Sequence, residues 1–226
     1  LGVVGYAIPF ALFPLSQQHL ASGVAAIINA LTPITTVIVS HFWPGGEKAT
    51  VLKSAGVAAG FTGAAILAIP ALQAGGTSQL WAIGACLTAT LCYAVTLNYT
   101  RRFAKIDPTT IATLALSGAA ITAVGAAFLF EGTPMMTRPE SYGAALGIGL
   151  LATTLAFLIM YRVLPRIGAT NFTTVTLIAP VSAIVLGTTL LGETIRTEHL
   201  LGMAAIFVGL LLIDGRIVRR FRRAPV

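Results

Sequence analysis

The fold is decided by the stretch GATNFTTVTLIAPVSAIVLGTTLLGE, Gly168 to Glu193. It is apolar, it carries one proline near its middle, Pro180, and its only charged residue is the last one. An α-helix needs about 20 apolar residues to cross the roughly 30 Å hydrocarbon core of a membrane. We therefore predict a membrane-spanning helix with a proline close to its centre.

A weaker copy of this stretch lies earlier, in ASGVAAIINALTPITTVIVSHFWPGGE, Ala21 to Glu47. The two stretches align at an offset of 147 positions, and the register continues into the next apolar segment at an offset of 146, because the first copy has one extra glycine, Gly46. The aligned pairs are Pro33 with Pro180, Gly45 with Gly192, Glu47 with Glu193, Gly56 with Gly202, Ala58 with Ala204, Phe61 with Phe207 and Gly63 with Gly209.

The composition places the chain in a membrane. Of its 226 residues, 56% are hydrophobic and 9% are charged, with a mean hydropathy of +0.89, whereas soluble domains are about one quarter charged. Eight apolar segments are long enough to span a bilayer. These segments are residues 1–18, 22–42, 50–70, 78–100, 109–131, 141–164, 170–191 and 198–215. We predict an all-α polytopic membrane protein.

The repeat predicts an inverted architecture. The aligned helices are five crossings apart, and an odd number of crossings turns the second unit upside down, as in many secondary transporters. Residues 1–73 would then hold the last three helices of a first five-helix repeat, and residues 74–226 a complete second repeat with a basic tail. We expect two further helices upstream, which gives ten helices in all.

The basic residues predict the orientation. If the chain crosses at every segment, twelve Lys and Arg residues fall on one side and two, Arg138 and Arg196, on the other. The positive-inside rule makes the basic side cytoplasmic, so the C-terminus is inside. The formal charge of +7 then reflects topology, and nucleic acid is not an expected partner. The expected partners are the lipid bilayer and a small-molecule substrate, with a homodimer left open, and the expected location is the cytoplasmic membrane of a bacterium.

Several stretches together resemble a known family. Gly168 to Glu193 followed by a glycine-rich last helix, the early ASGVAAIINALTPITTVIV, CYAVTLNYTRR (Cys92 to Arg102) and LPRIGAT (Leu164 to Thr170) resemble the EamA-like branch of the drug/metabolite transporter superfamily. The resemblance implies a ten-helix carrier of two inverted repeats that works by alternating access and exports amino acids or other small metabolites. The chain departs from the pattern in lacking the first two spans and in the extra Gly46.

The two prolines suggest a substrate cavity. A proline removes the helical donor for the carbonyl four residues earlier, so Pro33 frees the carbonyl of Asn29 and Pro180 that of Thr176. Such groups at mid-membrane depth either line a wet cavity or are satisfied by neighbouring helices or Ser/Thr side chains. Both interpretations stay open. In the first, the cavity residues are Asn29, Thr32, Pro33, Thr176 and Pro180, with Tyr93 and Phe13 as aromatic walls.

Other classes of function find less support in the residues. The three histidines lie near helix ends and form no HExxH motif, and no acidic residue lies in mid-span. We therefore expect no enzyme activity, no cofactor and no metal site. Glu47, Glu131, Glu193 and Asp214 are expected to lie at the membrane interface. The alternative to a carrier is a passive channel or a non-transporting membrane scaffold.

Overall fold

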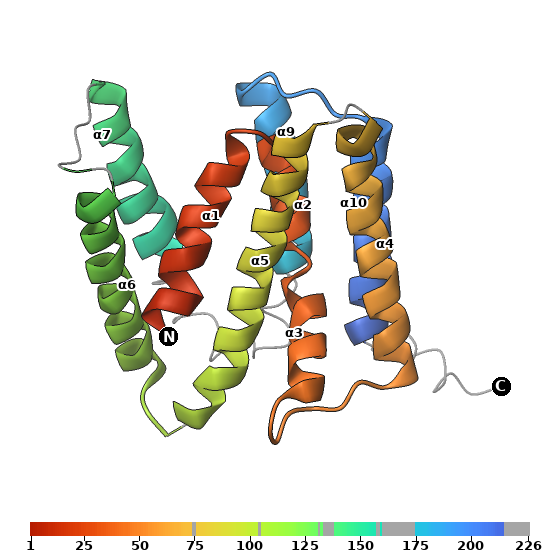
Figure 1. Cartoon of the computed structure of the whole chain (residues 1–226), viewed down its shortest axis with the longest axis horizontal. Coiled ribbons are helices and arrows are strands. Elements are labelled where there is room, and N and C mark those ends of the chain that lie inside the picture. Colours follow the sequence, from red (N-terminus) through yellow and green to blue (C-terminus); the bar gives the residue numbers. More distant parts are fainter. Residues whose placement is uncertain are drawn as a thin grey trace.

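The computed structural model describes residues 1–73, 76–103, 105–130, 132, 138–156, 159 and 175–214, and all regular structure within them is helical (Figure 1). The elements are η1 (Val3–Ala7), α1 (Ile8–Gln17), α2 (Ser22–Asn29), α3 (Thr32–Phe42), α4 (Val51–Gln73), α5 (Thr77–Thr100), η2 (Arg101–Phe103), α6 (Pro108–Phe130), α7 (Pro139–Leu146), η3 (Gly147–Leu155), α9 (Val175–Leu190) and α10 (Thr197–Asp214). The prediction of an all-α protein is confirmed.

Five helical stretches of the described residues are long and apolar enough to cross a membrane. They are Ser22–Phe42, Val51–Gln73, Thr77–Phe103, Thr109–Phe130 and Thr197–Asp214. The first of them is interrupted, since α2 ends at Asn29 and α3 begins at Thr32. The other predicted segments contain shorter helices in the described part of the chain, so the number of eight crossings stays a prediction.

Helices α4 and α10 pack closely along their length, on the right of Figure 1. A Cβ atom placed on Gly56 would lie 2.6 Å from the carbonyl oxygen of Gly209, and one on Gly63 would lie 2.6 Å from that of Gly202. A side chain larger than hydrogen therefore has no room at these positions. Small residues spaced four apart commonly let two membrane helices approach in this way.

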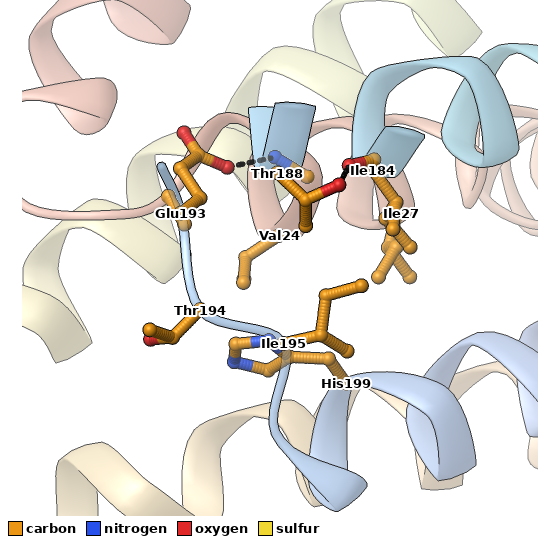
Figure 2. A pocket seen from close by; sticks show the side chains of 10 residues that line it. Val24, Ile27, Ile184, Thr188, Glu193, Thr194, Ile195 and His199 are labelled. Carbon is orange, nitrogen blue, oxygen red and sulfur yellow. Dashed lines mark hydrogen bonds between the residues drawn. The ribbon is translucent and has the colours of Figure 1, made fainter. Parts of the chain in front are cut away.

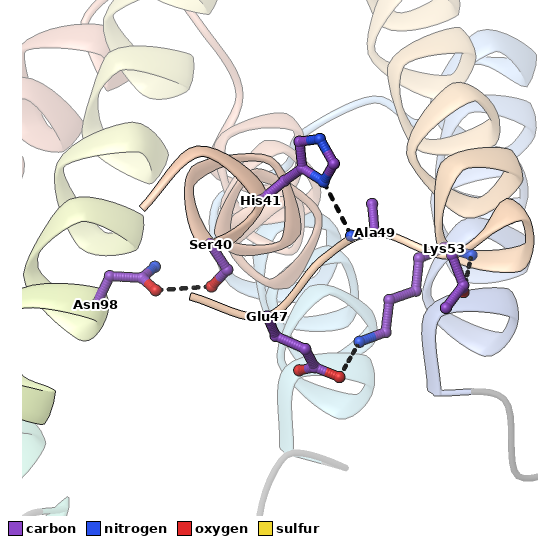
Figure 3. A network of polar contacts seen from close by, with 7 residues as sticks. Ser40, His41, Glu47, Ala49, Lys53 and Asn98 are labelled. Atoms are coloured by element: carbon purple, nitrogen blue, oxygen red, sulfur yellow. Dashed lines mark hydrogen bonds and ion pairs between the residues drawn. The ribbon is translucent and has the colours of Figure 1, made fainter. Parts of the chain in front are cut away.

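Helix α5 lies between α1 and α3 and is joined to both by polar contacts. Ser16 Oγ is 3.0 Å from Cys86 Sγ near the middle of α5, and Ser40 Oγ lies 2.7 Å from Asn98 Oδ1 near the C-terminal end of α5 (Figure 3). All four side chains are buried. Because buried polar groups that are paired hold helices in register, these contacts fix α1 and α3 against the same helix.

The buried core is formed mainly by α2 and α3 with the helices around them. Ile27, Ile28, Leu31, Ile34 and Ile206 have no exposed surface. By contrast, α6 on the left of Figure 1 exposes large apolar side chains along its outer face. Its exposed side chains include Leu114, Ile121, Phe128, Leu129 and Phe130. An apolar face of this extent is typical of a helix that meets lipid.

Candidate functional site

The interruption between α2 and α3 is the first of the predicted site features. Pro33 has no N–H to donate to the carbonyl of Asn29. The hydroxyl of Thr32 donates to that carbonyl instead, at 2.7 Å. The freed carbonyl is thus satisfied locally by a threonine side chain, which is the structural alternative that the sequence left open.

The side chain of Asn29 is the polar group that stays available at this break. It is exposed, and its Oδ1 lies 3.5 Å from the hydroxyl of Thr32. Within the described residues its amide nitrogen makes no hydrogen bond. A substrate that contacts this break would therefore meet the amide of Asn29 with its donors unpaired.

Phe13 and Tyr93 form the second group of predicted residues. Their rings stack with centroids 6.3 Å apart and an interplanar angle of 21°. Phe13 lies on α1 and Tyr93 on α5, and both are half-buried. The structure brings these two rings together as a pair, which suits either a pocket wall or helix packing.

Pro180 behaves differently from Pro33. It is fully buried inside α9, and that helix continues through it from Val175 to Leu190. The side chain of Thr176 lies outside the described residues. The hydrogen bonds and ring contacts of the described part of the chain thus join Asn29 with Thr32 and Phe13 with Tyr93, and link neither pair to Pro180.

Glu193 is a polar site whose contacts the sequence did not predict. It lies between α9 and α10, and its Oε1 accepts a hydrogen bond from the backbone N–H of Ser22 at 2.7 Å. Its Oε2 accepts a second from the N–H of Gly23 at 3.3 Å (Figure 2). These two N–H groups belong to the first turn of α2, where a helix leaves its donors unpaired and attracts negative charge. The carboxylate therefore caps a helix that lies far away in sequence.

The environment of Glu193 favours its charged form. Partial burial raises the pKa of this carboxyl group, but the hydrogen bonds from Ser22 and Gly23 outweigh it, and the net pKa lies below the ordinary value. A clue was present in the sequence. The residue at the N-cap of α2 is Ala21, which has no side-chain acceptor, so the cap had to come from elsewhere.

Two cavities meet at Glu193. A cavity of about 440 Å³ lies on one side of it, and the polar residues that line this cavity besides Glu193 are His19, Gln79, Thr194, Arg196 and His199. A cavity of about 10 Å³ lies between α2 and α9, lined by Val24, Ile27, Ile184 and Thr188 among others (Figure 2). The second space is close to the size of a single water molecule. The space on one side of the Glu193 carboxylate is therefore wide, whereas the space between α2 and α9 is almost filled.

Comparison with known proteins identifies the family. The sequence pattern of the EamA-like transporter family matches residues 80–214, more than half of the chain. The chain belongs to the EamA-like transporter family. It is therefore a multi-pass membrane transporter of the drug/metabolite transporter superfamily, and the family and its named relatives are transporters rather than enzymes.

The similar proteins cover the chain almost from end to end. An uncharacterized transporter of Archaeoglobus fulgidus is 22% identical over 94% of this chain and 75% of its own length. A probable terminal-alkyne amino-acid exporter of Streptantibioticus cattleyicolor is 25% identical over 99% of this chain and 74% of its own. A solved crystal structure matches with a TM-score of 0.61 and 22% identity, over 99% of this chain and 77% of that one. That structure supports the fold alone. The chain spans about three quarters of the length of these proteins.

Proposed function

We propose that the chain is a carrier that exports a small metabolite, an amino acid or a related compound, across the cytoplasmic membrane of a bacterium. The family match supports transport, and the relative of Streptantibioticus cattleyicolor, named as a probable exporter of an amino acid, supports the substrate class and the direction. The distribution of basic residues supports a cytoplasmic C-terminus. The carrier works by alternating access between two inverted repeats.

The observation that carries this proposal is the contact between α4 and α10. In the aligned repeats Gly56 corresponds to Gly202, and Gly63 corresponds to Gly209. In the structure Gly56 lies against Gly209 and Gly63 lies against Gly202. Each contact is thus repeated with the roles of the two repeats exchanged, and the two helices run antiparallel.

The large side chains at this contact follow the same rule. A Cβ atom on Gly56 would lie 2.7 Å from Ile213, and a Cβ atom on Gly202 would lie 2.7 Å from Leu67. Leu67 and Ile213 are 146 positions apart, the offset of the repeat. Reciprocal contacts of this kind are what a two-fold axis produces. For two antiparallel membrane helices that axis lies in the membrane plane, which supports a ten-helix bundle of two inverted repeats, with the last three helices of the first repeat in residues 1–73 and the second repeat in residues 74–226.

The substrate cavity of this carrier is proposed to lie at the break of the first repeat and its counterpart in the second. The free amide of Asn29 would hydrogen-bond the substrate, and the stacked rings of Tyr93 and Phe13 would form an apolar wall. Thr32 and Pro33 shape the break, and Thr176 and Pro180 are the matching positions of the second repeat. The exposed apolar face of α6 would contact the lipid bilayer.

Binding can be tested by thermal stability in detergent against amino acids, purines, sugars, polyamines and cationic dyes. A ligand at about 100 times its Kd stabilises the folded state by about 2.7 kcal/mol, which gives a readable shift of the melting temperature. We expect the amino-acid class to shift the melting temperature and Asn29→Ala or Tyr93→Ala to abolish the shift. Thr113→Ala, at an exposed position of α6, should leave it unchanged.

Transport is then measured in proteoliposomes loaded with the compound that binds. Saturable flux that falls in Asn29→Ala and persists in Thr113→Ala supports the carrier. Flux that rises linearly with concentration would indicate a passive channel instead. If no compound of the panel binds or moves, the proposed substrate class is wrong.

A further inference from the structure

The carboxylate of Glu193 joins the two proposed repeats at one end of the bundle. Glu193 follows α9 in the second repeat, and the N–H groups that it accepts, those of Ser22 and Gly23, open α2 in the first. The partners are 171 and 170 positions apart in sequence. Both oxygens of the carboxylate are used, one for each N–H. These bonds therefore tie the start of α2 to the end of α9.

Two glycines make room for this carboxylate. A Cβ atom on Gly187 of α9 would lie 2.5 Å from Glu193 Oε2 and 3.0 Å from Ser22 Oγ. A Cβ atom on Gly23 of α2 would lie 3.0 Å from Ile184 of α9. Any larger residue at Gly187 would occupy the space of the carboxylate. The crossing of α2 and α9 is thus shaped around the side chain of Glu193, which we call the Glu193 seat (Ser22, Gly23, Gly187 and Glu193).

The Glu193 seat lies where the path into the bundle narrows. Glu193 and His199 line both the open cavity of about 440 Å³ and the enclosed space of about 10 Å³ between α2 and α9. The enclosed space reaches Ile27 on α2, and α2 ends two residues later at Asn29, the proposed substrate contact. A route from the wide cavity along α2 towards the break at Asn29 would therefore lead between α2 and α9, past the seat.

We propose that Glu193 is the outer gate of the transport path, a carboxylate that holds α2 against α9 while the outer side is closed. The proposal rests on the carrier function and membrane orientation proposed above. Two charge-assisted hydrogen bonds suit a reversible closure, because water can replace both partners when the helices separate. The gate opens when α2 and the end of α9 move apart and the seat fills with water.

The test is the access of a membrane-impermeant maleimide to a cysteine behind the seat. Ile27 is fully buried and lines the enclosed space, so Ile27→Cys reports on opening. The background carries Cys86→Ser and Cys92→Ser, the only two native cysteines. In membranes labelled from the outside, Glu193→Gln should react at least about five-fold faster than the parent, because the amide carries no charge and has an NH2 group in place of one of the two acceptor oxygens.

Glu198→Gln is the matched control, a half-buried carboxyl of the first turn of α10 that makes no bond to α2 in the described structure. It should leave the labelling rate within two-fold of the parent. Gly187→Ala is the second gate variant, since its methyl group displaces the carboxylate without removing it, and it should also speed labelling. Melting temperatures confirm that each variant is folded. If Glu193→Gln does not fold, the labelling rate of Gly187→Ala tests the proposal.

An unchanged labelling rate in a folded Glu193→Gln or Gly187→Ala would overturn the gate. An equal acceleration by Glu198→Gln would overturn it as well, because the effect would then belong to any loss of charge at this end. Labelling needs no substrate, so its result is separate from that of the transport assay. Faster labelling together with an absence of saturable transport would overturn the carrier function. Glu193 would then still be the residue that holds α2 against α9.

Discussion

The two glutamates that follow the matched helices, Glu193 and Glu47, bind different partners. Glu193 hydrogen-bonds across the molecule to the start of α2. Glu47 pairs with Lys53 only six positions away, at 2.6 Å, and its side chain is 67% exposed (Figure 3). The hydrogen bond from Lys53 lowers the pKa of Glu47. Among the described residues, Glu193 thus joins segments far apart in the sequence, whereas Glu47 is paired within its own segment.

The cause of this difference can be read from the residues around each glutamate. At an offset of 147, Ser40 of α3 stands where Gly187 stands in α9. The hydroxyl of Ser40 is buried and bonded to Asn98 Oδ1, and the amide of Asn98 donates to the carbonyl of Ala94 at 2.9 Å. Ser40, whose side chain bonds to α5, therefore occupies the position at which α9 has a glycine that leaves room for a carboxylate. The two aligned stretches thus differ in the polar contacts at their ends.

The largest effect is expected from Glu193→Ala, which removes the acceptor of two N–H groups of α2. Loss of a helix cap costs about 1–2 kcal/mol, so the melting temperature should fall clearly below that of the parent. Glu47→Ala is the comparison variant, and its effect should be much smaller. Equal losses in the two variants would show that the two ends are equivalent after all.

Ser40→Ala should have the next largest effect. It leaves Asn98 Oδ1 buried without its donor, and an unsatisfied buried polar atom costs about 1–3 kcal/mol. The amide of Asn98 keeps its bond to Ala94, which places the expected loss at about 1 kcal/mol, in the low part of that range. Chemical denaturation measures it. Thr88→Ala, an exposed hydroxyl on α5 bonded within its own helix, is the control and should change stability less.

The smallest loss of stability is expected from Lys53→Met, which removes the ion pair with Glu47. Exposed pairs of this kind contribute about 0.2–1 kcal/mol and are screened by salt. The difference in melting temperature between Lys53→Met and the parent should therefore shrink further at high ionic strength. A loss as large as that of Glu193→Ala would contradict the distinction between the two ends.

The sequence predicted what depends on local pattern. The apolar segments gave the helices, and the glycines that the repeat aligned, Gly56 with Gly202 and Gly63 with Gly209, are positions at which α4 and α10 approach closely. The difference between the two prolines was not predicted, although it has a local cause. Thr32 precedes Pro33 and supplies a hydroxyl to the carbonyl of Asn29, whereas the matching residue before Pro180 is Ala179, which has none.

The contacts of Glu193 could not be predicted in the same way. Its partners come from a helix about 170 positions earlier, and no pattern around Glu193 specifies them. The sequence does contain a related signal at the other partner, because α2 starts after Ala21, whose side chain cannot cap the helix. Phe13 and Tyr93 were predicted as aromatic walls of a substrate cavity, and in the structure their rings are stacked on each other. The sequence thus indicated two aromatic residues that the fold brings together, but it did not indicate the two hydrogen bonds of Glu193.

The pH dependence of stability distinguishes a contact made by the Glu193 carboxylate from one controlled by a histidine. The other charged or titratable groups near Glu193 are Arg196, Glu198 and His199 at the start of α10 and His19 after α1. The described residues of α2 and α9 carry none. The pKa of Glu193 in the folded state lies below its ordinary value, which is about 4.3. The stability that Glu193 contributes is therefore complete above that value and is lost as the pH falls through the lower, folded pKa.

The difference in melting temperature between the parent and Glu193→Gln should accordingly stay constant from pH 8 to pH 5 and shrink below about pH 4. A change between pH 8 and pH 5 would instead indicate control by His199, because burial lowers the pKa of this imidazole below its ordinary value of about 6.5. Glu47→Gln provides the comparison at the inner end. Its pKa is also lowered, but because the pair with Lys53 is exposed, its difference from the parent should be small at every pH. A carboxylate that hydrogen-bonds to a distant helix and a carboxylate that pairs with a nearby lysine should thus titrate in the same acid range with unequal effects on stability.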